Sequence, residues 1–192
     1  MKRFLMILAA FAASVLLSGP AQGGIFGNKA KTYTFNSLPQ NLAELKALPQ
    51  ADMKDPYGVA ALTLLALCRY ETSPEDCFEM LNWLKGPGSL STYEKQFIAE
   101  RLKGKGYKPR SFFAGATPAN NYTPNKPYKF TPVSNPNTFT SEGWATIWVR
   151  SGGADNPRSI KLRQKKSTGE WFLNDIQCLS DIRTPAEDDP WA

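Results

Sequence analysis

Residues 55–70 read DPYGVAALTLLALCRY and predict a helix that has no polar face. Asp55 is a favoured N-cap residue, and Pro56 suits the first helical position, where its missing N–H is not needed. The apolar side chains that follow occupy every side of the helix: Val59, Ala60, Ala61, Leu62, Leu64, Leu65, Ala66 and Leu67. Such a helix must be surrounded by protein, and about ten apolar residues are too few to cross a bilayer. We therefore expect this helix to form the centre of the core.

Three further helices are predicted around this core helix. One runs over residues 41–48 and a second over residues 73–85, each bounded by proline or glycine. Ser91 and Glu94 form a capping box that begins the third, and Gly104 ends it. The apolar stripes expected to face the core are Leu42, Leu45 and Leu48, then Cys77, Met80 or Leu81 and Leu84, and finally Tyr93, Phe97, Ile98 and Leu102.

The last third of the chain alternates with a period of two, which is typical of β-strands. Both faces of residues 144–150 are largely apolar, which predicts an interior strand. Residues 159–165 and 171–179 follow as two strands joined by a hairpin at Ser167-Thr168-Gly169. Helices followed by strands predict an α+β fold, with N-terminal helices packed on a C-terminal antiparallel sheet.

Residues 109–136 connect the two halves and are rich in proline and asparagine, which disfavours both helices and interior strands. Aromatic residues within this segment argue against disorder. We expect an ordered loop that lies along the surface.

The N-terminus has the layout of a secretory signal peptide over residues 1–23. Lys2 and Arg3 precede an apolar run that ends at Leu17, and small residues follow up to Gly23. The run is too short for a stable transmembrane span, so cleavage is favoured over an uncleaved anchor. We expect a secreted or periplasmic protein with a flexible arm over residues 24–34 and a single domain over residues 35–192. At the junction between them, Thr32 to Phe35 is expected to form a short edge strand or an ordered arm.

The composition excludes several classes of function. The formal net charge of +6 falls to +4 without Lys2 and Arg3, and no run of like charges indicates nucleic-acid binding. The sequence contains no histidine, which excludes Ser-His-Asp and Cys-His catalytic groups and histidine-ligated metals. Three cysteines are too few and wrongly spaced for a structural zinc. We expect neither a metal nor a cofactor.

Cys68 and Cys77 allow two interpretations. In an oxidising compartment a helical hairpin would bring them together as a disulfide, which leaves Cys178 as a free thiol. Alternatively, all three cysteines are buried and reduced.

Three motifs resemble those of a bacterial family catalogued as a domain of unknown function. They are GATPANNYTP at residues 115–124, SGGADNPR at 151–158 and DPWA at 189–192. The resemblance covers residues 35–192 and implies a single bacterial domain. The family has no assigned activity, so it carries over no catalytic residues. The element order is also similar to that of cone-shaped folds of the nuclear transport factor type, an analogy of fold alone.

Two loops contain the candidate ligand-binding residues. In residues 112–128, tyrosine rings beside asparagine amides would stack on and hydrogen-bond a polar ligand such as a glycan or a peptide. The alternative is that the tyrosines only anchor the loop. In residues 151–158, glycine amides and an arginine would hold an anion, unless Asp155 caps its own turn and pairs with Arg158. The residues are Asn120, Asn121, Tyr122, Tyr128, Asp155 and Arg158.

Two weaker candidates lie on the predicted sheet. Lys161, Arg163 and Lys165 share one strand face, which is a solvated face or a surface that attracts anionic polymers or headgroups. Trp144 and Trp148 either line a pocket or pack in the core.

These observations favour a non-catalytic binding or interaction module over an enzyme. The alternative is a carboxylate-dependent hydrolase that acts on an envelope or extracellular polymer. Its candidate carboxylates are Glu94, Glu100, Asp155, Asp175 and Asp181. Their spacing singles out no pair, and we expect Asp181 to form a turn ion pair with Arg183.

Overall fold

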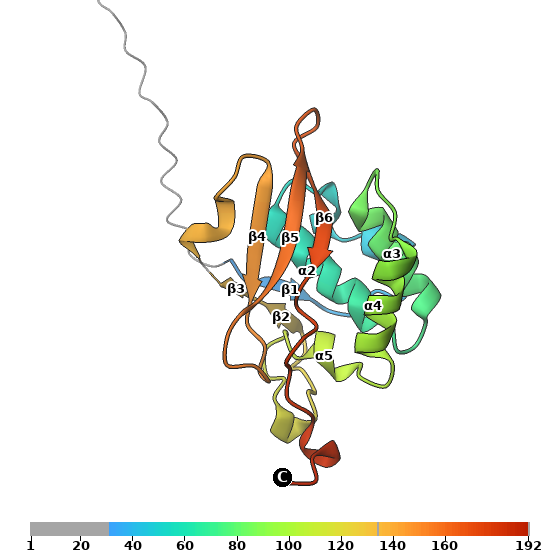
Figure 1. The fold of residues 1–192 in the computed structure, drawn as a ribbon, viewed down its shortest axis with the longest axis vertical. Helices are drawn as coiled ribbons and strands as arrows, with labels where there is room; N and C mark the ends of the chain where they lie inside the picture. The colour runs from blue at the N-terminus through green and yellow to red at the C-terminus, as the bar shows by residue number, and fades with distance from the viewer. Residues whose placement is uncertain (1–30, 134, 192) are drawn as a thin grey trace, which may run out of the picture.

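Most helices lie in the first half of the chain and most strands in the second, which confirms the α+β class (Figure 1). A computed structural model describes residues 31–133 and 135–191. The predicted signal peptide and residues 24–30 of the predicted arm lie outside the described residues. The helices are α1 (Leu42–Lys46), α2 (Pro56–Cys68), α3 (Pro74–Lys85), α4 (Thr92–Leu102) and α5 (Tyr107–Arg110). The strands are β1 (Tyr33–Phe35), β2 (Tyr128–Phe130), β3 (Pro132–Val133), β4 (Trp144–Val149), β5 (Arg158–Lys165) and β6 (Glu170–Ile176).

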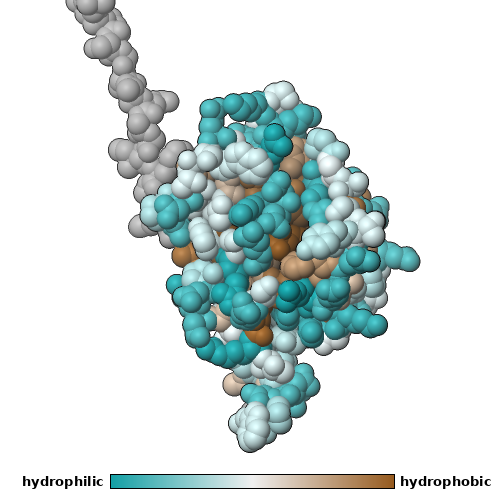
Figure 2. Space-filling view, viewed as in Figure 1, coloured by the Kyte–Doolittle hydropathy of each residue, from teal (hydrophilic) through white to brown (hydrophobic). Residues whose placement is uncertain are grey.

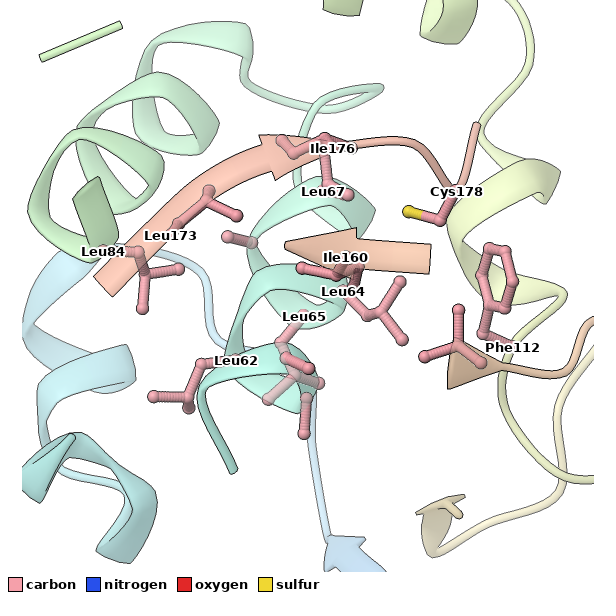
Figure 3. Close-up of a cluster of buried hydrophobic side chains, with 14 of the residues drawn as sticks. Leu62, Leu64, Leu65, Leu67, Leu84, Phe112, Ile160, Leu173, Ile176 and Cys178 are labelled. Carbon is pink, nitrogen blue, oxygen red and sulfur yellow. The ribbon is translucent and has the colours of Figure 1, made fainter. Parts of the chain in front are cut away.

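Helix α2 is the centre of the core, as its composition predicts. The Asp55 side chain accepts a hydrogen bond from the Tyr57 amide at 3.0 Å, and every residue from Gly58 to Leu67 is buried. The helix packs against α3 and against β4, β5 and β6. Figure 3 shows leucines of α2 among side chains of α3, β5 and β6. Replacing a leucine at such a position by alanine costs about 2–5 kcal/mol.

The predicted caps are present, but the predicted core residue Tyr93 is exposed to solvent. Ser91 and Glu94 form the capping box of α4. Tyr93, which we expected to face the core, is 75% exposed. An α-helix turns once every 3.6 residues, so Tyr93 lies well off the face that carries Ile98 and Leu102.

A four-stranded antiparallel sheet, in the order β3-β4-β5-β6, covers α2. β4 lies between β3 and β5, as expected of an interior strand, and turns Ala145, Ile147 and Val149 toward the core. β5 and β6 form the predicted hairpin, with Gly169 at a positive φ of 71°. α2 lies behind the sheet in Figure 1, while α3 and α4 lie beside β6. The opposite face of the sheet, called the outer face below, carries Trp144, Arg163 and Phe172.

The proline-rich segment contains more regular structure than the sequence indicates. It is ordered, as predicted, but it includes the short strands β2 and β3 and a 3-10 helix, Pro118–Asn120. β2 pairs with β1, so the chain around Tyr33 adopts the strand alternative. Proline is tolerated at the first position of a strand, where Pro132 stands.

Cys68, Cys77 and Cys178 are free thiols, so the structure contains the reduced alternative and not the Cys68–Cys77 disulfide. Burial raises the pKa of Cys68 and of Cys178 to about 12 and also raises the pKa of Cys77. Within residues 31–133 and 135–191, no helix is both long enough and apolar enough to span a membrane.

Candidate functional site

Tyr122, a predicted ligand-binding residue, is completely buried. Its ring stacks on Tyr107 with centroids 5.2 Å apart, and its hydroxyl donates a hydrogen bond to the Arg183 carbonyl at 2.7 Å. Burial raises the pKa of Tyr122 to about 12. The contacts match the alternative in which the tyrosine anchors the loop.

The other predicted loop residues also bond within the protein. The Asn120 amide group donates to the Gly115 carbonyl at 2.7 Å, and its oxygen accepts from the Thr117 amide at 2.9 Å. Asn121 donates to the Glu187 carboxylate at 2.7 Å. Half-buried Tyr128 packs edge-to-face on Phe113, with centroids 5.9 Å apart. Sequence alone cannot show whether Asn120, Asn121 and Tyr128 bind a ligand or anchor the loop, because only the folded chain shows which groups they contact.

The glycine turn at residues 151–158 does not present free amides to an anion. The Gly152 amide donates to the Ser111 carbonyl at 2.9 Å, and the Gly153 amide donates to the Ser151 hydroxyl at 3.0 Å. A side chain at Gly153 would collide with the Tyr122 hydroxyl. The turn is therefore packed against the proline-rich loop.

Neither of the two ion pairs that the sequence suggested near this turn is present. Asp155 pairs with Arg183 at 2.6 Å, and so neither the Asp155–Arg158 pair nor the Asp181–Arg183 pair forms. The reason is a long-range contact, since the Arg183 amide donates to the Gly153 carbonyl at 2.9 Å and brings the later segment across the turn. Arg158 instead donates to the Ser180 and Asp181 carbonyls, at 2.9 and 2.8 Å.

Four of the predicted site residues thus converge on residues 180–187, which we call the C-terminal strap. Asn121, Tyr122, Asp155 and Arg158 each bond to it. These contacts hold the strap in place.

A groove on the outer face of the sheet gathers aromatic and basic side chains that sequence reasoning considered separately. It has a volume of about 560 Å³, within the usual range for ligand sites. It lies between the sheet, the turn after α3 and the residues around the hairpin; its lining includes Lys85, Pro87, Glu142, Trp144, Arg163, Lys165, Lys166, Phe172 and Asn174. Figure 2 shows hydrophobic side chains along β6 on this side of the molecule, with hydrophilic ones around them. We call this the outer groove.

Strand register explains why three of these side chains are neighbours. Arg163 on β5 stands directly opposite Trp144 on β4 and Phe172 on β6, and opposed residues share a face. The Arg163 guanidinium lies 5.2 Å from the centre of the Trp144 ring, within cation–π range. Trp144 is 40% exposed, so much of its surface faces solvent. Phe172 packs closely against Gly86 of the turn after α3.

Some cations of the outer groove are paired and others are not. Lys166 pairs with Glu142 at 2.9 Å, and Lys85 pairs with Glu94 at 2.5 Å. Arg163 and Lys165 form no ion pair with any residue that the structure describes. These two side chains are therefore placed to meet an anion from outside.

A second, more open cavity of about 550 Å³ borders the start of the proline-rich loop. Phe112, Lys129 and Arg150 contribute to its lining. It contains fewer exposed aromatic groups than the outer groove, because Phe112 is buried.

The candidate carboxylates have contacts that suit structure more than acid catalysis. Burial raises the pKa of Glu94, but hydrogen bonds from Lys85 and Ser91 outweigh it and hold the pKa below its ordinary value. A general acid needs the opposite shift. Glu94 and Asp175 line a common cavity, but its volume of about 30 Å³ admits no more than a water. Among the described residues, no group of three or more Cys, Asp or Glu side chains is arranged to hold a metal ion.

Comparison with known proteins gives one match. The model of the family described as a domain of unknown function, DUF6935, matches residues 37–186. No curated protein and no solved structure matches the chain, so the cone-like analogy stays a prediction. The chain belongs to the DUF6935 family.

Proposed function

We propose that this protein is an exported binding module that holds a negatively charged polar ligand in the outer groove and does not transform it. One observation carries the proposal: Arg163 lies unpaired against an exposed Trp144, on the floor of a groove of about 560 Å³. In this proposal the ligand binds to the outer face of the sheet and not to the loop residues that the sequence suggested.

The arrangement supports binding because it is organised before a ligand arrives. An arginine side chain loses conformational entropy when a ligand fixes it. Contact with Trp144 already restricts Arg163 in the free protein, so less entropy is lost on binding. Lys165 extends the positive charge along the same strand face. Trp144 and Phe172 add apolar surface, which favours a ligand with both charged and apolar parts.

Export is part of the proposal and is supported by the sequence of residues 1–23. A protein outside the cytosol meets charged polymers of the cell envelope and its surroundings. A surface that attracts anions suits such partners.

The test is calorimetric titration of the purified full chain with acidic and neutral polymers. We expect acidic polymers to bind, with affinity that falls as salt rises. Arg163→Ala should weaken binding at least about tenfold, since a hydrogen bond to a charged group contributes about 1.5–3 kcal/mol.

Arg150→Ala is the matched control, because it removes the same charge just after the end of the neighbouring strand β4, outside the outer groove. It should leave affinity within about twofold. A larger loss in Arg150→Ala than in Arg163→Ala would assign binding to the second cavity. Release of reducing ends from a polymer would instead support the hydrolase alternative.

A further inference from the structure

Resting on the proposed function, we infer that the ligand of the outer groove is a glycan chain that carries carboxylate groups. Arg163 and Lys165 meet its carboxylates, while Trp144 and Phe172 contact the apolar faces of its sugar rings.

The backbone around the groove disfavours an extended peptide. A peptide that adds to a sheet needs a free strand edge, but the floor strand β5 is paired on both sides, with β4 and β6. The outer edge of β6 is also engaged. The Trp171 amide donates to the Met53 carbonyl at 2.7 Å, and the Lys85 ammonium group donates to the Asn174 carbonyl at 3.3 Å. A ligand must therefore be recognised through side chains.

The side chains of the groove match the two surfaces of a sugar ring. A sugar ring has an apolar face of C–H groups and an edge of hydroxyl groups. Trp144 and Phe172, with Pro87 in the lining, offer apolar surface to the first. Asn174 supplies an amide to the second, and its side chain is exposed.

The charges favour carboxylates that are separated along the ligand. A guanidinium matches a planar carboxylate through two parallel hydrogen bonds. Arg163 and Lys165 are two residues apart on one strand face, about 6.6 Å along the strand, which suits separate charges. Glu142 lies in the same lining, paired with Lys166, and adds a negative charge that opposes a densely charged anion. Polyphosphate and heavily sulfated chains are therefore disfavoured.

The experiment titrates the purified full chain with three carboxylated glycans, namely polygalacturonate, alginate and hyaluronate. Methyl-esterified polygalacturonate is the matched neutral ligand, because it keeps the backbone and loses the charge. Dextran sulfate, polyphosphate and polyglutamate represent the other sources of negative charge. Circular dichroism establishes that each variant is folded.

We expect at least one carboxylated glycan to bind and, when that ligand is polygalacturonate, methyl esterification to weaken binding at least tenfold. Arg163→Ala and Trp144→Ala should each weaken the same ligand at least tenfold, with Arg150→Ala within twofold. Arg163→Lys keeps the charge but not the paired hydrogen bonds, so it should recover only part of the loss.

Two outcomes overturn the inference in different ways. If dextran sulfate, polyphosphate or polyglutamate binds more tightly than every carboxylated glycan and depends on Arg163, the inference fails while the proposed function stands. If no probe shows binding that depends on Arg163, both fail.

Discussion

Tyr122 illustrates how a residue type that is common in binding loops serves packing instead. Its ring and hydroxyl both have partners inside the protein, and its backbone has a positive φ of 53°. Sequence reasoning recognised the aromatic ring beside two asparagines, but burial depends on the C-terminal strap, which is distant along the chain. The sequence therefore showed that these residue types cluster in the loop, but it could not show that Tyr122 is buried.

Tyr122→Phe tests this anchoring role. The change leaves the Arg183 carbonyl without its hydroxyl partner, so we expect the free energy of unfolding to fall by about 0.5–1.5 kcal/mol. Denaturant unfolding measures the change. Tyr93→Phe is the control, because Tyr93 is 75% exposed and should show almost no effect. Equal effects of the two substitutions would contradict the assignment.

Lys108 predicts a dependence of stability on alkaline pH. Burial lowers its pKa, as do Lys105 and Arg101, and its ammonium group donates to the Leu179 carbonyl at 3.0 Å. The unfolded chain binds this proton more tightly than the folded chain does, so protonation of Lys108 favours unfolding. This destabilising effect is lost as pH rises through the lowered pKa toward the unfolded-state value of about 10.4. As pH rises toward about 10.4, the wild type should therefore gain stability relative to Lys108→Met. A stability difference that does not change with pH would contradict the prediction.

The three cysteines allow a direct test of their redox state. Because all three thiols have raised pKa values, the folded protein should react slowly with a thiol reagent at neutral pH. After denaturation without a reductant, Cys68, Cys77 and Cys178 should all react. Detection of a single reactive thiol would indicate a disulfide in the purified protein.

At the level of helices and strands, local signals predicted most of the fold. N-caps at Asp55, Ser73 and Ser91 each start a helix, and alternation located β4, β5 and β6. Local signals gave β1 only as one of two alternatives and did not predict β2 or its pairing with β1, because a strand of three residues is defined by a distant partner. The outer groove was missed for the same reason, since its walls come from both halves of the chain.

The turn after α3 contributes both to the stability of the fold and to the shape of the outer groove. Gly86 has a positive φ of 64°, and a side chain there would collide with the ring of Phe172. Gly86→Ala should therefore lower the free energy of unfolding by about 1–3 kcal/mol and weaken ligand binding. Gly88→Ala is the control in the same turn, because no atom lies within 4 Å of its new methyl group. Unfolding curves and titrations of both variants make the comparison, and similar stabilities would count against this account.

For the whole molecule, the described domain should be independent of the predicted signal peptide. Its first element, β1, begins at Tyr33, so a chain that lacks residues 1–23 should unfold with the free energy of the full chain. When the full gene is expressed in a bacterium, mass spectrometry of exported protein should show an N-terminus near Ala21 or Gly23. Folded protein with an intact N-terminus in the cytosolic fraction would contradict export.

The position of α2 has a consequence for biosynthesis. This helix leaves the ribosome early, yet the strands that cover it begin only at Trp144 and end at Ile176. Until those strands are synthesised, the apolar side chains of α2 are exposed to water and to other nascent chains. The growing polypeptide should therefore depend on chaperones that bind apolar segments, and it should remain unfolded enough to be threaded through a translocation channel.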